Sequence, residues 1–539
     1  MPDGKTGTPP SDWILPVFAR FIAWQFRRSL LEFALSPNEY HAMIDEPIYR
    51  KKALGAWLGK AVGGTLGAPW EGCRGPLALT FYDPVPTDMV PNDDVDLQVV
   101  WACRLATDWR GVVSYANLSD AWQRNIGFAL DEYGVAKRNL ARGIPAPHSG
   151  AYDNAFTDGM GAAIRSEIWA LLAPGDPATA ARLARVDASV DHAGAGVHAE
   201  QFLAALESAL FATSDLRAAI AAGLAQIPSD SRLARAIADT IRLCDDGGDF
   251  ASVRAAILRD RGSENFTDVS MNLSFEVAAL LLGGGDFAKT ICLAVNCGRD
   301  ADCTGATVGA ILGILDPDAI PDEWLRPIGR SLVLNEGIAG IEPPPTLDAL
   351  TDLIASLRDR VSIDDAEPPR PDLSRFAIRC RRGLYRPWFA YDCLRARPEE
   401  QPLPEEVLLP GNVSTVDFSG LPPESLLLLE TDLDLPAAQD ALLVVSTTAD
   451  FRAWLDGEPV LGQECGPFVP AFHRTPANQR KALRLAAGVH KLRIGLAPAG
   501  EGMASAPLAF GLAAPADSAW LPDSIYDHPG AVETGCAAG

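Results

Sequence analysis

The chain has 539 residues, which is too long for one ordinary domain and suits either two large domains or three to four average ones. Its content of 48% hydrophobic and 22% charged residues is typical of a soluble globular protein. Lysine plus arginine total 46 and aspartate plus glutamate total 70, so the net charge is −24. Nucleic acids and anionic membranes would repel such a chain, and we expect neither as a partner.

The N-terminal segment, residues 1–48, is expected to be a helical extension. Residues 1–10 contain Asp3 and Lys5 and no apolar core, so they do not resemble a signal peptide. Residues 13–35 are apolar at helical spacing, but charged residues interrupt them, which favours docking on the protein over spanning a membrane. The ten cysteines include no CxxC pair and no zinc-type spacing, so we interpret them as reduced thiols of a cytoplasmic protein.

Residues 49–360 are predicted to form a helical domain. Short apolar runs rich in alanine and leucine follow one another and are separated by glycine or aspartate. The clearest runs cover residues 201–213, 215–227, 231–244, 250–258, 273–282 and 286–297. No alternating strand pattern stands out among them. A helical bundle of this size can enclose a buried polar site.

The remaining sequence changes character after a proline-rich segment, residues 361–376, which we interpret as a linker. Beyond it the hydrophobic period changes from 3.6 to 2. Strand-like runs cover residues 426–435, 441–446, 451–455 and 489–496, and Asp456-Gly457 is typical of a hairpin turn. Residues 377–520 are therefore predicted to form a smaller all-β sandwich of jelly-roll type, followed by a frayed tail over residues 521–539.

Two acidic clusters stand at predicted loop-to-helix junctions. The first contains Asn92, Asp93 and Asp94, and the second contains Asp300 and Asp302. Adjacent carboxylates in apolar surroundings repel each other unless a cation neutralises them, and oxygen ligands suit Mg²⁺, Mn²⁺ or Ca²⁺ better than zinc. Each cluster alone is more typical of a solvated loop or a helix cap, but two clusters of this kind, each leading into a helix, favour a metal site.

A glycine-rich segment, residues 55–72, suggests close packing of helices. Glu71 ends its apolar run, where a carboxylate without a partner would be costly. A surface acid at a helix end remains the alternative interpretation of Glu71.

Together these motifs resemble the ADP-ribosylglycohydrolase family over residues 50–335. Gly67-Ala68-Pro69-Trp70-Glu71 resembles the end of the family's first helix, and Asn92-Asp93-Asp94 resembles its hydroxyl-Asp-Asp motif. Asp300-Ala301-Asp302-Cys303-Thr304 resembles its Asp-x-Asp-Thr motif, and residues 158–165 resemble its central segment.

The resemblance implies an all-α fold with a metal centre, usually of two magnesium ions, that binds a ribose ring. It implies that the metal ligands are Asn92, Asp93, Asp94, Asp300, Asp302 and Thr304, and that the catalytic residues are Glu71, Asp94 and Asp302. It further implies a substrate-binding set of Asp158, Gly159, Met160, Arg165, His192 and Arg299. His192, however, is more typical of a residue that orients a loop than of a catalytic one.

The sequence departs from the family pattern at several positions. Asn92 replaces a hydroxyl ligand, Gly64 stands where many members have aspartate, and Arg299 adds a cation beside Asp300. Cys303 stands where the family has threonine or serine, and a thiol is a poor magnesium ligand. Either Thr304 substitutes for it or one metal position opens to water.

We therefore expect a metal-dependent glycohydrolase that acts at the anomeric carbon of a ribose-like sugar on a small-molecule or ADP-ribosyl substrate. The alternative is a glycosidase for a non-nucleotide saccharide, which an added β-sandwich favours by analogy. A sugar-binding member of the fold without catalytic activity is the third hypothesis, although Glu71 and all four aspartates are present.

Overall fold

The computed structural model describes residues 44–385, 401–422, 425–464, 466–469, 476–500 and 502–513. Nearly all of the predicted N-terminal extension and the whole predicted tail, residues 521–539, lie outside these ranges. Within them, no helix is both long enough and apolar enough to cross a membrane.

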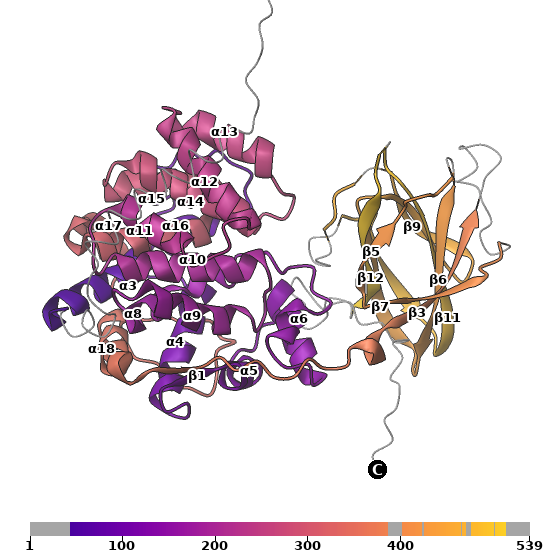
Figure 1. Ribbon diagram of the computed structural model, residues 1–539, viewed down its shortest axis with the longest axis horizontal. Coiled ribbons are helices and arrows are strands. Elements are labelled where there is room, and N and C mark those ends of the chain that lie inside the picture. Colours follow the sequence, from indigo (N-terminus) through magenta and orange to yellow (C-terminus); the bar gives the residue numbers. More distant parts are fainter. Residues whose placement is uncertain are drawn as a thin grey trace, which may run out of the picture. The chain divides into compact units, whose positions relative to one another are not determined.

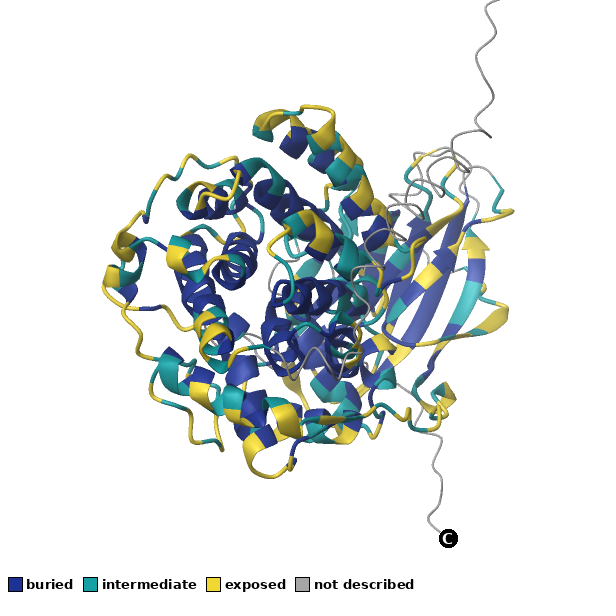
Figure 2. Cartoon of the chain, turned by 60° about the vertical axis from the view of Figure 1, so that its left-hand side comes forward, coloured by how far each residue is buried: buried dark blue, intermediate teal, exposed yellow. Residues whose placement is uncertain are grey.

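The first large region is helical, as the sequence predicts (Figure 1). Helices at its centre are buried on all sides, and those around them expose one face (Figure 2). In chain order, the helices are α3 (Glu46–Gly67), α4 (Asp93–Ala106), α5 (Tyr115–Arg124), α6 (Asp131–Ala141), α7 (His148–Ala151), α8 (Glu167–Leu172), α9 (Pro177–Ala188), α10 (Ala195–Ala209), α11 (Leu216–Leu224), α12 (Arg232–Asp245), α13 (Phe250–Arg261), α14 (Val269–Gly283), α15 (Phe287–Asn296), α16 (Ala301–Leu315), α17 (Asp322–Ile328) and α18 (Leu347–Leu357).

Side-chain caps explain where many of these helices begin. Each capping side chain accepts a hydrogen bond from a backbone N–H of the first turn, which would otherwise lack a partner. Aspartate, serine, asparagine or threonine fills this role at Asn92, Ser114, Asp176, Asp215, Ser231, Asp249, Asp268, Asp286 and Thr346. The predicted runs that began at such residues therefore match helices α11 to α13 and α15 closely.

Helices α3 and α16 pack against each other through glycines. A Cβ atom added at the α3 glycines that face α16 would overlap a backbone carbonyl oxygen of α16. A Cβ atom added at the facing glycines of α16 would in turn overlap a carbonyl oxygen of α3. The facing pairs are Gly55 with Gly313, Gly59 with Gly309, Gly63 with Gly305, and Gly67 with Ala301. The pairing runs in opposite directions along the two helices, so the C-terminal end of α3 meets the N-terminal end of α16.

The predicted linker, residues 361–376, is partly built into secondary structure. Strand β2 (Ser362–Asp364) pairs in parallel with β1 (Val112–Ser114), a strand within the helical region. Asp365 and Glu367 form ion pairs with Arg182 and Arg185 of α9. The start of this segment is thus held by the helices through backbone pairing, which its proline content did not indicate.

The second region is a sandwich of two antiparallel sheets. One sheet has the strand order β10-β7-β12-β5 and the other β4-β3-β6-β11-β8-β9. The strands are β3 (Ile378–Tyr385), β4 (Glu405–Leu409), β5 (Val413–Asp417), β6 (Leu426–Leu435), β7 (Gln439–Thr447), β8 (Asp450–Leu455), β9 (Glu458–Gln463), β10 (Arg480–Leu485), β11 (Gly488–Ala497) and β12 (Ser505–Ala513).

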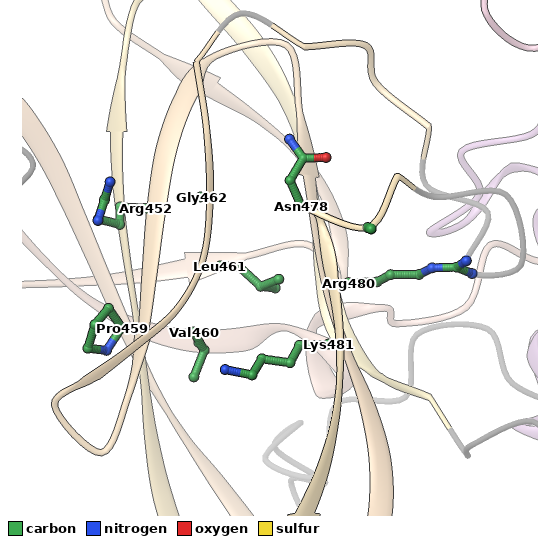
Figure 3. Close-up of a pocket in the computed structure, with 9 residues that line it drawn as sticks. Arg452, Pro459, Val460, Leu461, Gly462, Asn478, Arg480 and Lys481 are labelled. Carbon is green, nitrogen blue, oxygen red and sulfur yellow. The ribbon is translucent and has the colours of Figure 1, made fainter.

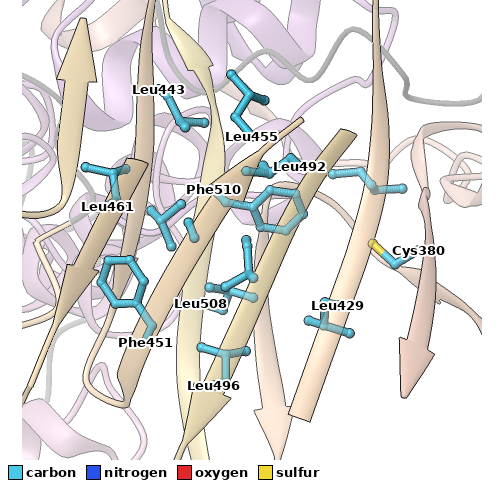
Figure 4. Packing of buried hydrophobic residues seen from close by; sticks show 14 of the residues in the cluster. Cys380, Leu429, Leu443, Phe451, Leu455, Leu461, Leu492, Leu496, Leu508 and Phe510 are labelled. Atoms are coloured by element: carbon cyan, nitrogen blue, oxygen red, sulfur yellow. The ribbon is translucent and has the colours of Figure 1, made fainter. Parts of the chain in front are cut away.

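Leucine and phenylalanine side chains fill the space between these sheets. Leu443, Phe510 and Leu492 are less than 2% exposed and lie together in this core (Figure 4). The turn between β8 and β9 is formed by Asp456 and Gly457, with φ values of 51° and 85°. Both central residues therefore have the positive φ of a tight hairpin turn, as their sequence predicts.

A surface hollow of about 380 Å³ lies where β9 and β10 form open sheet edges (Figure 3). Its lining includes Arg452, Asn478 and Lys481 together with apolar residues of β9, and none of the described residues that line it carries a carboxylate. In Figure 3 the Lys481 side chain extends toward the β9 hairpin, whereas Arg480 points away from it. The described residues of this lining therefore offer no pair of carboxyl groups of the kind that glycosidases use.

The glycine contacts predict a position-specific effect on stability. Changing Gly59 to alanine forces a methyl group against the backbone of Gly309, which cannot move without shifting α16. We expect Gly59→Ala to lower the free energy of unfolding by roughly 3 kcal/mol, measured by urea denaturation.

Gly64→Ala, in the same helix, is the matched control. The nearest atoms to its added Cβ are side-chain atoms of Asn92 at 3.2 Å and Ala306 at 3.5 Å. We expect it to change stability by less than about 1 kcal/mol, since alanine also favours the helix. Equal effects of the two substitutions would show that close backbone packing does not limit this interface.

Candidate functional site

The loop that carries Glu71 is bound to the loop that carries Asp300. Glu71 follows α3 and a short 3-10 helix, η2 (Ala68–Trp70), and is exposed. The backbone N–H of Gly72 donates to the Arg299 carbonyl at 2.8 Å, and the N–H of Arg299 donates to the Cys73 carbonyl at 2.6 Å. This reciprocal pair, together with the α3–α16 packing, brings Glu71 beside the second acidic cluster.

The first acidic cluster forms the start of α4. The Asn92 side-chain oxygen accepts a hydrogen bond from the Asp94 N–H at 2.9 Å, while its amide nitrogen lies 3.5 Å from Asp302 Oδ2. Asn92 therefore caps α4 and connects the two clusters. Asp94 is 1% exposed, and Asp93 accepts a hydrogen bond from the Tyr133 hydroxyl at 3.1 Å.

The carboxylates of both clusters converge. Ligand atoms of Glu71, Asp300 and Asp302 lie within 4.8 Å of one another, and so do those of Asp94, Asp302 and Cys303. Asp302 belongs to both groups. Oδ2 of Asp300 and Oδ1 of Asp302 are buried and have no hydrogen-bond donor among the described residues. Buried carboxylate oxygens without donors suit a divalent cation, because an ion would supply the missing positive charge.

The electrostatics of the cluster agree with this interpretation. Burial raises the pKa of Asp94 and Asp300 well above the usual range, and in both cases neighbouring carboxylates raise it further. Burial, followed by the charges of Glu71 and Asp93, raises the pKa of Asp302 to about 7. Burial and the same aspartates also raise the pKa of the Cys303 thiol. Burial and mutual repulsion thus disfavour the charged form of these acids, and a bound divalent cation would offset both effects.

A buried lysine provides a permanent cation next to this cluster. Lys60 Nζ lies 2.8 Å from Glu167 Oε1 and 3.4 Å from Asp94 Oδ1, and all three side chains are at most 1% exposed. Burial lowers the pKa of Lys60, but the charges of Glu167 and Asp94 outweigh it and raise the pKa above its usual value. Gln98 donates to the other Glu167 oxygen at 2.7 Å, so the lysine and its partner are held in place.

Arg165 and His192 belong to a separate buried network. The Arg165 guanidinium donates to Asp187 Oδ2 at 3.0 Å and to both oxygens of Asp191, at 2.7 and 2.9 Å, and it stacks over Trp122. His192 Nδ1 lies 3.0 Å from Asp191 Oδ1. Neither Arg165 nor His192 has appreciable exposed surface, and the contacts of both described here are with other buried residues of the helical region.

The other expected substrate residues occupy different environments. Gly159 and Met160 are buried, and a Cβ at Gly159 would touch the Glu132 carboxylate. Asp158 is partly exposed and pairs with Arg232 at the edge of a surface hollow of about 440 Å³. Arg299 is also partly exposed, and its guanidinium donates to the Ser263 carbonyl at 3.3 Å. Of the expected set, only Asp158 and Arg299 offer side chains at the surface.

Thr304, an expected metal ligand, has its hydroxyl turned to its own helix. The hydroxyl donates to the Ala301 carbonyl at 3.2 Å and is fully buried. The preceding residue, Cys303, is the one whose side chain faces the acidic cluster.

Three residues of the site were not singled out from the sequence. Lys60 contacts Asp94, Tyr133 donates to Asp93, and the charge of Glu132 adds to burial in raising the pKa of Asp93. Lys60 had a recognisable signal, because a single lysine inside a glycine-rich apolar helix needs a buried partner. Glu132 and Tyr133 come from α6 and are brought to the site only by the tertiary fold.

The buried Lys60 pair predicts a large loss of stability on substitution. Lys60→Met leaves Glu167 and Asp94 without their cation, and breaking one partner of a buried pair costs about 3–5 kcal/mol. Lys51→Met in the same helix is the control, since Lys51 pairs with Asp318 at the surface and should cost less than about 1 kcal/mol. Urea denaturation measures both. Similar losses would mean that Glu167 and Asp94 are neutral in the native protein.

His192 predicts a pH dependence of stability. Burial lowers the pKa of His192, but Asp191 and Glu132 outweigh it and raise the pKa from 6.5 to about 9. A group whose pKa is raised on folding stabilises the protein fully below its unfolded pKa and loses this contribution as the pH rises through the folded value. The Tm should therefore fall by several degrees between pH 6.5 and 9.

The comparison is with His192→Gln, which lacks this ionisation. Its Tm should change less than that of the wild type over the same pH range, although it starts lower. Parallel pH profiles for the two proteins would show that His192 is neutral in the fold.

Comparisons of sequence and structure relate the chain to known proteins. The family model for ADP-ribosylglycohydrolase matches residues 45–360. A solved structure described as an ADP-ribosylglycohydrolase-related protein complex is 24% identical and covers 58% of this chain and 99% of its own, with a TM-score of 0.41. No curated protein is significantly similar in sequence.

Solved structures of a beta-glucosidase from Kluyveromyces marxianus also match. The complex with glucose is 13% identical and covers 26% of this chain and 17% of that chain, with a TM-score of 0.20. The selenomethionine-labelled form is 13% identical and covers 31% and 22%, with a TM-score of 0.19. This chain therefore spans less than a quarter of that enzyme.

The family model covers more than half of the 539 residues, including Glu71 and both acidic clusters. The chain belongs to the ADP-ribosylglycohydrolase family.

Proposed function

We propose that the chain is a metal-dependent glycohydrolase that cleaves an N- or O-glycosidic bond at the anomeric carbon of a ribose-like sugar. An ADP-ribosyl group is the substrate that family membership favours. The observation that carries the proposal is the placement of Glu71, which is exposed, against Asp300 and Asp302, which are buried.

The donor set of the cluster fits magnesium. Asp93, Asp94, Asp300 and Asp302 offer hard oxygen ligands, and three of them, Asp94, Asp300 and Asp302, each have a buried oxygen without a hydrogen bond from any described residue. When bound, the metal would hold sugar hydroxyls and polarise a water molecule. Asn92 supports the ligands by capping α4 and contacting Asp302.

Glu71 is suited to move the proton. It is the only exposed member of its group, so it can reach the glycosidic oxygen or nitrogen of a bound substrate or the attacking water. Acid–base assistance of this kind is what an oxocarbenium-like transition state requires. The reciprocal hydrogen bonds between the Gly72–Cys73 and Arg299 backbones hold the Glu71 loop at a set distance from Asp300.

Positive charge near these loops favours an anionic substrate group. Arg74 follows Glu71 by three residues, and Arg299 precedes Asp300 directly. Burial lowers the pKa of Arg299, and the nearby charge of Arg74 lowers it further, so the two guanidinium groups lie close to each other. Arg74 also forms an exposed ion pair with Glu264 at 3.3 Å, and we infer that a diphosphate such as that of an ADP-ribosyl group competes with this carboxylate for the two guanidinium groups.

Glu71→Gln tests the proposal, because it keeps the shape of the side chain and removes its charge and its proton transfer. We expect turnover of an ADP-ribosylated substrate to fall by roughly 10²- to 10⁴-fold. Stability and Mg²⁺ binding, followed by thermal shift, should stay near those of the wild type. Nitrophenyl glycosides of non-nucleotide sugars, assayed in parallel, test the alternative glycosidase activity.

Glu323→Gln, at an exposed glutamate of α17, is the control and should leave turnover unchanged. Turnover of Glu71→Gln within about threefold of wild type, a barrier change of under ~1 kcal/mol, would assign the proton transfer to another residue. Unfolding of this variant would show that the carboxylate is structural.

A further inference from the structure

The thiol of Cys303 points into the acidic cluster. Cys303 lies in the first turn of α16, is 8% exposed, and places its Sγ 3.8 Å from Asp94 Oδ2. Its sulfur lies within 4.8 Å of a ligand oxygen of Asp94 and of Asp302. The thiol therefore occupies the position where a side chain could complete a three-ligand set.

The neighbouring hydroxyl cannot take this place without rotating. Thr304 donates to the Ala301 carbonyl within its own helix, one residue further around the helix from Cys303. Helix α16 therefore presents the Cys303 sulfur, and not the Thr304 hydroxyl, to Asp94.

A second observation points to a cation beside Cys303. Asp302 Oδ1 is buried without a hydrogen-bond donor, and its side chain is more than nine-tenths buried. Lys60 lies 3.4 Å from Asp94 Oδ1, whereas Oδ2 of the same carboxylate is the oxygen near the sulfur. Lys60 thus pairs with Oδ1 of Asp94, while Oδ2 remains available to coordinate a cation.

We propose that Cys303 is a metal ligand and that the centre has two chemically different positions that share Asp302. Asp300 and Asp302 form an all-oxygen position beside Glu71 that suits Mg²⁺ or Mn²⁺. Asp94, Asp302 and Cys303 form a mixed oxygen–sulfur position that suits a thiophilic divalent ion such as Zn²⁺ or Co²⁺. The inference rests on the proposed metal-dependent function and adds that the two positions select different metal ions.

Binding at the mixed position exchanges a proton for a metal ion. The Cys303 thiol loses its proton to solvent and the resulting thiolate coordinates the ion, with no change in oxidation state. Metal binding should therefore release more protons from the wild type than from Cys303→Ser, and the difference can be counted in buffers of different ionisation enthalpy.

Cobalt is the probe, because a thiolate–Co²⁺ bond gives a charge-transfer absorption in the near ultraviolet that oxygen ligands do not give. We expect the full-length protein to show this band on titration with Co²⁺. Cys303→Ser should lose the band and should bind Zn²⁺ more weakly by roughly tenfold or more. Its thermal stabilisation by Mg²⁺ should persist.

Cys292→Ser is the matched control, since Cys292 is a buried free thiol of α15 outside both ligand sets, and it should keep the band. Cys303→Ala serves as a second variant and should also lose it.

Three outcomes would overturn the assignment of Cys303. The first is Co²⁺ binding to the wild type without the band, and the second is a band that survives in Cys303→Ser. In both cases Mg²⁺-dependent stabilisation and turnover would leave the proposed function standing. The third is a wild type that binds no divalent ion at all, which would overturn the metal-dependent function together with the Cys303 assignment.

Discussion

The contact between α3 and α16 is the constraint on which the site depends. Glycine at every fourth position of α3 faces Gly305, Gly309 and Gly313 of α16, so the two backbones touch directly. Because the helices run in opposite directions, the end of one meets the start of the other. Glu71 and Asp302, more than 200 residues apart in sequence, are adjacent for this reason. Larger side chains along this seam would separate them.

Charge inside the helical region is divided between structural and functional groups. Arg165 forms ion pairs with Asp187 and Asp191, and both carboxylates are fully buried. Lys60 neutralises Glu167 and part of Asp94. Asp300 and Asp302 form no ion pair with a lysine or arginine among the described residues, and burial together with neighbouring carboxylates raises their pKa values. This cluster opens to the surface at Glu71, whereas another buried acid without a hydrogen-bond donor among the described residues, Glu276, lies inside α14.

This division also separates the roles of residues that look alike in the sequence. Arg165 and Arg299 both lie beside glycine-rich motifs with aspartate nearby, but only Arg299 retains exposed surface. Its backbone adopts φ = 69° after a glycine with φ = 69°, in a region that most residues avoid. The turn that results delivers the Arg299 carbonyl and N–H to the Glu71 loop. Backbone conformation at this position thus contributes more to the site's geometry than the guanidinium does.

Local patterns in the sequence determined the elements and the kind of chemistry. Hydrophobic period and capping residues identified helices such as α12 and strands such as β6, because both signals act within a few residues. The acidic motifs identified Glu71, Asp94, Asp300 and Asp302 as one candidate site by resemblance.

Only the tertiary structure decided which side chains face it. The rotation of α16 presents Cys303 and turns Thr304 away, the packing of α3 brings Lys60 to Asp94, and the burial of Arg165 removes it from the surface. These outcomes depend on contacts between distant segments, which no local pattern encodes.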